Sequence, residues 1–113
     1  MITGTLTLGE NIADSGGLQH AYFALKNKLG EGKLYSPSGI GSFTHAQLFF
    51  ISFGQSWCNK ATVEEELLNI DVDPHSPPPY RVLGALSNFD EFSTAFKCPN
   101  GSVYNRDVMC RVW

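Results

Sequence analysis

Apolar residues recur at helical spacing over most of the chain, and helix start and stop signals flank the stretches where they do so. The first stripe runs from Leu8 to Leu29 and is followed by Gly30, a residue type that commonly ends helices. Thr7 and Glu10 have the spacing of a capping box, in which two side chains satisfy backbone N–H groups of the first turn. These signals predict a long helix that begins near Thr7.

A second helix is predicted after residues 30–41, a Gly- and Ser-rich segment that is typical of a surface loop. Thr44 and Gln47 form another capping-box pattern. The helix body from Ala46 to Trp57 is apolar nearly all round, which is typical of a helix buried on most sides. A chain of 113 residues can hardly surround such a helix, so we expect neighbours that this sequence does not contain.

Shorter helices are predicted in the second half of the chain. Thr62 and Glu65 form a capping-box pattern that starts a third helix. Residues 71–79 are predicted to be non-helical because four prolines crowd them. Ser76 as N-cap and Pro77 at the first helical position predict the start of a fourth helix.

Two further apolar stripes belong to this fourth helix and to a fifth: Tyr80, Leu83 and Leu86, then Phe89, Phe92 and Phe96. The tail, residues 99–113, is rich in turn-forming residues. Strand signals are weak, and no internal repeat or domain boundary is visible. The sequence therefore predicts one mainly α unit over residues 1–113.

Composition narrows the class of protein. A hydrophobic content of 42% can supply a globular core. The formal net charge of −3 leaves no basic patch for phosphate groups, so nucleic acid is not an expected partner. No apolar run approaches the roughly 18 residues of a membrane span. The first residues also lack the features of a secretory signal peptide, so any targeting or anchoring segment is expected outside this sequence.

The chain has three cysteines, Cys58, Cys98 and Cys110, and none belongs to a Cys-x-x-Cys pair. Buried free thiols in a cytosolic protein are the simplest interpretation, whereas in a secreted protein the odd count leaves at least one thiol without an internal partner. The segment from Asn100 to Ser102 fits a glycosylation acceptor. The pattern alone favours an ordinary Asn-Gly turn there.

Glu10 and Asp14 are candidate metal-site residues. Their spacing of four places both carboxylates on one face of a helix. Glu10 could coordinate zinc, and Asp14 could accept a hydrogen bond from a zinc-binding histidine and so orient its ring. Acidic residues also suit a first helical turn, and the spacing by itself favours capping over metal binding.

His75 lies in a proline-bounded turn between Asp73 and Arg81. If Asp73 accepts a hydrogen bond from one ring nitrogen, the other nitrogen could donate to a developing oxyanion. Arg81 could hold a substrate carbonyl or carboxylate. The alternative is a surface histidine with a solvated arginine. His20 and His45 have no acidic or cysteine partner at ligand spacing, so we expect ordinary surface or capping roles for them.

Several motifs in this chain resemble, in the same order, those of the neprilysin and endothelin-converting enzyme family of zinc metalloendopeptidases. They are LTLGENIADSGGL at 6–18, QLFFISFGQSWC at 47–58, DPHSPPPYRV at 73–82, FSTAFKCP at 92–99 and CRVW at 110–113. The resemblance covers nearly the whole chain. It implies the C-terminal portion of a thermolysin-like, mainly helical catalytic domain that cleaves oligopeptides with one Zn²⁺ ion.

The resemblance also implies roles for individual residues. Glu10 corresponds to the third zinc ligand, and Asp14 to the acid that orients a zinc-binding histidine. His75 corresponds to the transition-state stabiliser with Asp73 behind it, and Arg81 to a residue that binds substrate backbone. The cysteines are expected to form disulfides with partners upstream of this stretch.

The chain departs from the family pattern in three ways. It has no His-Glu-x-x-His segment, which supplies two histidine ligands and the general base, and no Asn-Ala-x-Tyr-type segment for substrate backbone. Tyr104-Asn105-Arg106 stands where the family usually has Met-Asn-Pro. We therefore expect this chain to be inactive without the upstream part of the same catalytic domain. The alternative is a truncated, non-catalytic binding or antigenic module.

The resemblance further implies an extracellular or cell-surface location. Most members are type II membrane ectoenzymes, and some are secreted. Membrane attachment is expected only through an N-terminal anchor that these residues do not include.

Overall fold

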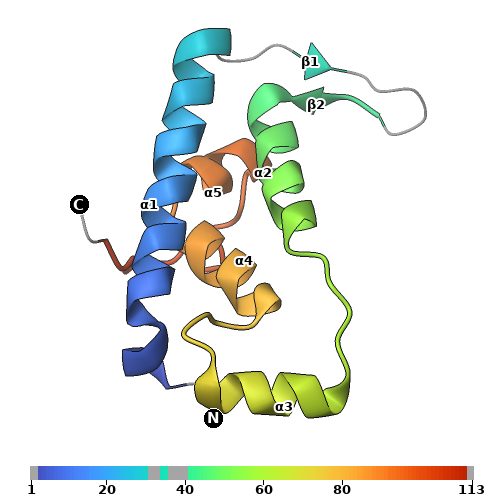
Figure 1. Ribbon diagram of the computed structural model, residues 1–113. Helices are drawn as coiled ribbons and strands as arrows, with labels where there is room; N and C mark the ends of the chain where they lie inside the picture. Colours follow the sequence, from blue (N-terminus) through green and yellow to red (C-terminus); the bar gives the residue numbers. More distant parts are fainter. Residues whose placement is uncertain (1–2, 31–33, 36–40, 112–113) are drawn as a thin grey trace.

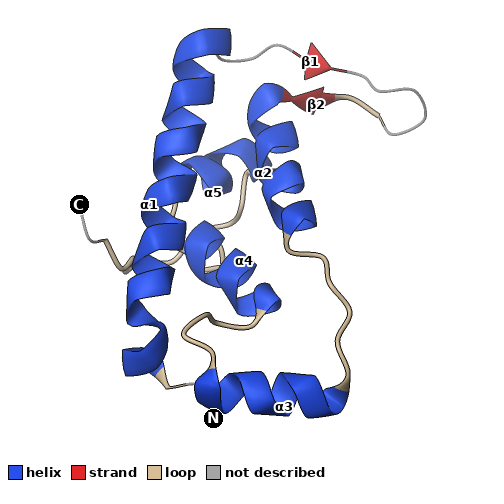
Figure 2. Cartoon of the chain, in the orientation of Figure 1, coloured by secondary structure: helices blue, strands red, loops and turns tan. Residues whose placement is uncertain are grey.

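The described residues form five helices and one two-stranded sheet. The computed structural model describes residues 3–30, 34–35 and 41–111. The elements are α1 (Gly4–Leu29), β1 (Leu34–Tyr35), β2 (Phe43–Thr44), α2 (His45–Ser56), α3 (Val63–Val72), α4 (Pro78–Ser87) and α5 (Asp90–Phe96). Figure 1 shows α1 beside α2, with α4 and α5 packed against this pair and α3 set apart at the bottom. The predominance of helix in Figure 2 agrees with the predicted mainly α class.

The first helix begins earlier than the sequence predicts. Its N-cap is Thr3, which makes no side-chain capping bond, and its C-cap is Gly30 as expected. Thr7 lies inside the helix, where its Oγ1 accepts a hydrogen bond from Asn11 Nδ2 at 3.1 Å. The predicted capping box of Thr7 and Glu10 is therefore wrong. Glu10 instead lies in the helix body and has no capping function to perform.

The predicted start of α2 is confirmed. Thr44 Oγ1 accepts from the backbone N–H of Gln47, and Gln47 Oε1 accepts from the backbone N–H of Thr44, at 3.1 and 3.0 Å. Part of the predicted loop 30–41 is strand instead, because β1 pairs antiparallel with β2 in the register Leu34↔Thr44. Residues 31–33 and 36–40 of that prediction lie outside the described residues.

The predictions around the prolines need correction. Thr62 caps α3 by accepting from the backbone N–H of Glu65, as expected. However, α3 continues through Val72 and α4 begins at Pro78, so the first two and the last two residues of the predicted non-helical segment 71–79 are helical. Pro77 is the N-cap of α4, and Pro78 is its first residue. The side chain of Ser76 does not cap this helix because its hydroxyl is hydrogen-bonded to α1.

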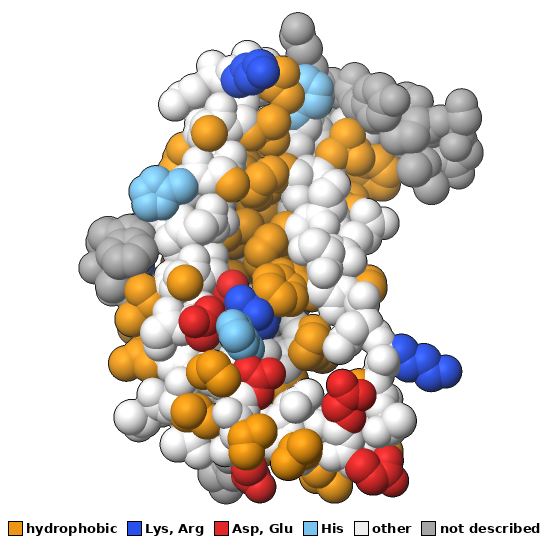
Figure 3. All heavy atoms as spheres, viewed as in Figure 1, with side chains coloured by type: hydrophobic (Ala, Val, Ile, Leu, Met, Phe, Trp, Pro, Cys, Tyr) orange, Lys and Arg blue, Asp and Glu red, His pale blue; other side chains and the backbone are white. Residues whose placement is uncertain are grey.

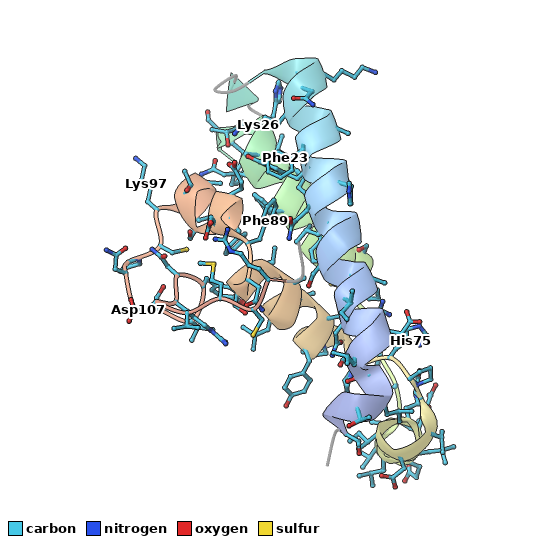
Figure 4. The ribbon with its side chains drawn as sticks, turned by 90° about the vertical axis from the view of Figure 1, so that its left-hand side faces the viewer. Phe23, Lys26, His75, Phe89, Lys97 and Asp107 are labelled. Carbon is cyan, nitrogen blue, oxygen red and sulfur yellow. The ribbon has the colours of Figure 1, made fainter. Side chains whose placement is uncertain are left out.

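An aromatic cluster forms the core between α1, α2 and α5. Tyr22 stacks on Phe50 with ring centroids 5.1 Å apart, and Phe89 meets both rings edge-on. Figure 4 shows Phe23 and Phe89 directed into this region. Phe50 is the only buried residue of α2. The chain by itself therefore does not surround α2, in line with the expectation that its neighbours lie outside this sequence.

The tail folds into turns, as predicted. Ser102 and Asn105 form an isolated β-bridge, and Gly101 between Asn100 and Ser102 has a φ of 78°. This left-handed conformation is one that glycine adopts without strain. The structure thus places Asn100 in a turn, and glycosylation of its side chain stays a prediction. None of the described helices is long and apolar enough to cross a membrane.

Candidate active site

The candidate site residues meet where α1 packs against α4 and the turn before it. Glu10 and Asp14 come from the first half of α1, His75 from the turn, and Arg81 from the first half of α4. In Figure 3, acidic, basic and histidine side chains gather below the centre of the face shown. Figure 4 shows His75 beside the N-terminal part of α1, well separated from Phe23 and Phe89. The structure therefore brings together residues that lie more than 60 positions apart.

His75 lies between two carboxylates. Its Nδ1 is 2.7 Å from Oδ1 of Asp73, and its Nε2 is 3.1 Å from Oε2 of Glu10. The backbone N–H of His75 also donates to Oδ1 of Asp73, at 2.9 Å. This backbone hydrogen bond, followed by the bond from the ring, holds the pKa of Asp73 below its ordinary value of 3.8. The turn therefore fixes the imidazole on one side and leaves Nε2 directed at Glu10.

Arg81 binds Asp14 through a bidentate pair. Nε and Nη2 of Arg81 donate to the two carboxylate oxygens of Asp14, each at 2.6 Å. The two side chains are only 14% and 11% exposed, so water screens the pair weakly. The hydrogen bonds to Asp14 raise the pKa of Arg81 above its ordinary value. Arg81 therefore crosslinks α4 to α1 as a permanent cation.

Trp57 is a neighbour of Arg81 that the sequence did not reveal. The guanidinium carbon of Arg81 lies 3.9 Å from the centroid of the Trp57 ring, which is a cation–π distance. Trp57 is the C-cap of α2, so this contact also ties the end of α2 to the site. No local signal could have shown it, because the two residues are far apart in the chain.

Asn11 and Ser76 were also missed. Ser76 Oγ donates to Oδ1 of Asn11 at 2.9 Å. The available signal was adjacency, since Asn11 follows Glu10 and Ser76 follows His75. His20 and His45 lie away from this cluster. Nδ1 of His20 contacts the backbone oxygen of Gly16, and His45 is the first residue of α2.

The side chains of this cluster could supply part of the ligand set of a zinc site. Glu10 is a carboxylate with a side chain 41% exposed, which suits a metal ligand. Catalytic zinc uses three protein ligands, and the described residues contain no group of three acidic, histidine or cysteine side chains placed for a metal. A zinc ion held by Glu10 therefore needs further ligands from outside the described residues.

Two hollows meet at Asp14. An open cavity of about 400 Å³ lies between α1 and α4, and its lining includes Asn11, Ser76 and Arg81. A second hollow of about 340 Å³ runs between α1 and α2 and is mostly apolar. In Figure 3, a band of hydrophobic side chains leads down the face of the molecule to the charged cluster. Glu10 and His75 line neither hollow, and their side chains are 41% and 43% exposed.

Comparison with known proteins decides the family. The family model of peptidase family M13 matches residues 1–112. The chain belongs to peptidase family M13. The resemblance to the neprilysin and endothelin-converting enzyme family is thereby confirmed.

Individual relatives match over nearly the whole chain. The endothelin-converting enzyme homolog of Locusta migratoria is 48% identical over 112 residues. Endothelin-converting enzyme 1 of Homo sapiens is 47% identical over 113, and neprilysin of Oryctolagus cuniculus 47% over 115. Each match covers 99% of this chain, but the chain spans only 14–15% of the relatives' own length.

Solved structures support the same fold. The inhibitor complex of the Mycobacterium tuberculosis zinc metalloprotease ZMP1 matches with a TM-score of 0.86 and 33% identity. The open state of the same enzyme matches with a TM-score of 0.85. Each match covers 99% of this chain and 17% of the solved chain. The predicted fold class, part of a zinc metalloprotease catalytic domain, is therefore confirmed for this M13 chain.

Proposed function

We propose that residues 1–113 form the C-terminal part of the catalytic domain of a zinc-dependent metalloendopeptidase that cleaves oligopeptides. The observation that carries the proposal is the continuous contact from Asp73 through His75 to Glu10, beside the Asp14–Arg81 pair. M13 membership over residues 1–112 supports it. The chain supplies part of the site, and the upstream part of the same domain supplies the rest.

Glu10 is proposed as the third zinc ligand. When bound, zinc supplies the Lewis-acid chemistry that activates a water molecule for peptide hydrolysis. The general base and two histidine ligands come from a His-Glu-x-x-His segment outside this chain. The Glu10 carboxylate, whose side chain is 41% exposed, is accessible to a metal ion, which supports this role.

His75 is proposed to stabilise negative charge on the scissile carbonyl oxygen. Asp73 accepts the hydrogen bond from Nδ1, so a proton on Nε2 can be donated away from the turn. A preorganised donor of this kind is most effective where charge develops in the transition state. The two hydrogen bonds from His75 to Asp73 keep the ring in that orientation before substrate arrives.

Arg81 is proposed to bind a substrate carbonyl while it holds Asp14. Arginine has five N–H donors, and two of them point at Asp14, so three remain for a second partner. Asp14 accepts on both oxygens from Arg81 and retains lone pairs for a zinc-binding histidine. One bidentate pair can therefore serve the metal side and the substrate side of the site.

The proposed partners follow from the same assignment. They are a peptide substrate, the upstream part of the catalytic domain, and cysteines there that pair with Cys58, Cys98 and Cys110. All three thiols are free in this chain, and those of Cys58 and Cys110 are exposed, which leaves them accessible to cysteines outside it. An extracellular or cell-surface location is proposed with them, with any membrane anchor upstream and no nucleic acid partner.

Hydrolysis of a fluorogenic oligopeptide by the full native polypeptide tests the proposal. We expect activity that a zinc chelator removes, and His75→Gln should lower kcat by about 10²-fold with bound zinc retained. His20→Gln, which changes an exposed histidine elsewhere on α1, is the matched control and should leave kcat unchanged. A native polypeptide of only 12.4 kDa without hydrolysis would contradict the proposal and favour a non-catalytic module.

A further inference from the structure

Two contacts run side by side between α1 and the turn that carries His75. One is the exposed pair between Glu10 and His75, whose side chains are 41% and 43% exposed. The other joins the next residue in each segment, because Ser76 Oγ donates to Oδ1 of Asn11 at 2.9 Å. Within the described residues, no other hydrogen bond or ion pair links residues 73–77 to α1.

The second contact continues into the body of α1. Nδ2 of Asn11 donates to Oγ1 of Thr7 at 3.1 Å, so the Asn11 amide is held from both ends. Thr7 is 4% exposed and Ser76 is 7% exposed. Buried hydroxyls need a partner, and each of these two depends on the Asn11 side chain, so the amide orientation is fixed.

The two contacts differ in what a metal would do to them. An exposed ion pair contributes little in water, and a metal ion bound to Glu10 would draw negative charge from the carboxylate and weaken its attraction for His75 further. The bond between Ser76 and Asn11 involves no group that binds metal. It therefore remains when Glu10 is engaged, and it ties the turn to α1 at the residue next to His75.

We propose that Asn11 and Ser76 are positioning residues that hold the His75 turn against α1 independently of the metal. This inference rests on the proposed role of His75. Neither residue touches substrate in this scheme. They set the distance between two groups that do the chemistry, and an error of about 1 Å in such a distance can cost on the order of 10²-fold in rate.

Matched variants of the full native polypeptide separate positioning from simple packing. Ser76→Ala removes the donor, whereas Ser76→Thr keeps a hydroxyl at the same position. Asn11→Ala removes the acceptor. Ser87→Ala is the control, because Ser87 is a buried serine whose hydroxyl donates to Gly84 within α4 and has no contact with the turn.

Three readouts are measured: steady-state kinetics, bound zinc, and hydrogen exchange of the His75 and Ser76 amides. We expect Ser76→Ala to lower kcat by about 10-fold, with KM and bound zinc close to wild type. The two amides should exchange faster in Ser76→Ala and Asn11→Ala. Ser76→Thr should restore both properties, and the double variant should be no worse than either single variant.

Two results would overturn the inference. One is unchanged kcat and unchanged exchange in Ser76→Ala. The other is loss of bound zinc, or of kcat, to the same extent in Ser87→Ala. If His75→Gln itself leaves kcat unchanged, the proposed role of His75 fails, while the exchange measurements still decide whether Asn11 and Ser76 hold the turn.

Discussion

Asp14 of α1 and Arg81 of α4 are 67 positions apart in the chain, yet two hydrogen bonds of 2.6 Å join them. The sequence suggested separate roles for these residues, one toward a zinc-binding histidine and one toward substrate. The structure shows one largely buried ion pair between the helix that carries Glu10 and the helix that follows His75. Much of the site's geometry therefore depends on one ion pair.

A double-mutant cycle on this pair should reveal strong coupling. Arg81→Ala leaves the Asp14 carboxylate, only 11% exposed, without its cation, which should lower the free energy of unfolding by about 3 kcal/mol. Asp14→Ala should cost a similar amount, and the double variant much less than the sum of the two. Urea unfolding of the metal-free polypeptide measures all four proteins. Additive single effects would contradict the coupling.

Truncating an aromatic side chain at the centre of the core should destabilise the fold much more than truncating one at its edge. Phe50 is 2% exposed, so Phe50→Ala removes a fully buried ring and should cost about 4 kcal/mol. Phe96 is 36% exposed and packs against the same cluster, which makes Phe96→Ala the matched control with a smaller loss. Thermal melting compares the two. Equal losses would show that Phe50 is not at the centre of the core.

The pKa of Asp73 should depend on the hydrogen bonds that its carboxylate accepts from His75. The folded-state pKa is lowered below 3.8, so the stabilisation is present above pH 3.8 and is lost as the pH falls through the lower, folded pKa. Carbon NMR of the Asp73 carboxyl measures this pKa directly. His75→Ala should raise it only in part, because the backbone N–H of residue 75 still donates. A wild-type pKa at or above 3.8 would contradict the hydrogen-bond geometry.

The 113-residue chain by itself should bind zinc weakly. Of the residues in the cluster, Glu10 is the proposed ligand and His75 could add at most one more, whereas catalytic sites use three protein ligands. Isothermal titration should therefore give a dissociation constant above about 1 µM. Tighter binding with one zinc per chain would mean that the chain holds a complete site, contrary to the assignment of the missing ligands to the upstream part.

Local patterns predicted the fold where they depended on neighbours in the sequence. The capping box of Thr44 and Gln47 and the stop at Gly30 are both present. The prediction failed where a side chain that has a capping pattern makes other contacts in the folded structure instead. Ser76 has the pattern of an N-cap, but its hydroxyl binds Asn11, and Thr7 is buried inside α1 rather than capping it.

The candidate site was less accessible to spacing arguments. Spacing placed Glu10 and Asp14 on one helix face but favoured capping, and only the family resemblance indicated metal chemistry. Contacts such as Arg81 over Trp57 join segments that no periodicity connects. They depend on how α2 and α4 pack onto α1, which the pattern of apolar positions does not specify.

The most direct test of the central proposal is the zinc content of the full native polypeptide with Glu10→Val, measured after dialysis against zinc-free buffer. Glu64→Val, on the exposed face of α3, is the matched control. We predict about one zinc per molecule in the wild type and the control, and loss of zinc and of peptide hydrolysis in Glu10→Val. Wild-type zinc content in Glu10→Val would contradict the assignment of Glu10 as a ligand and, with it, the account of this site.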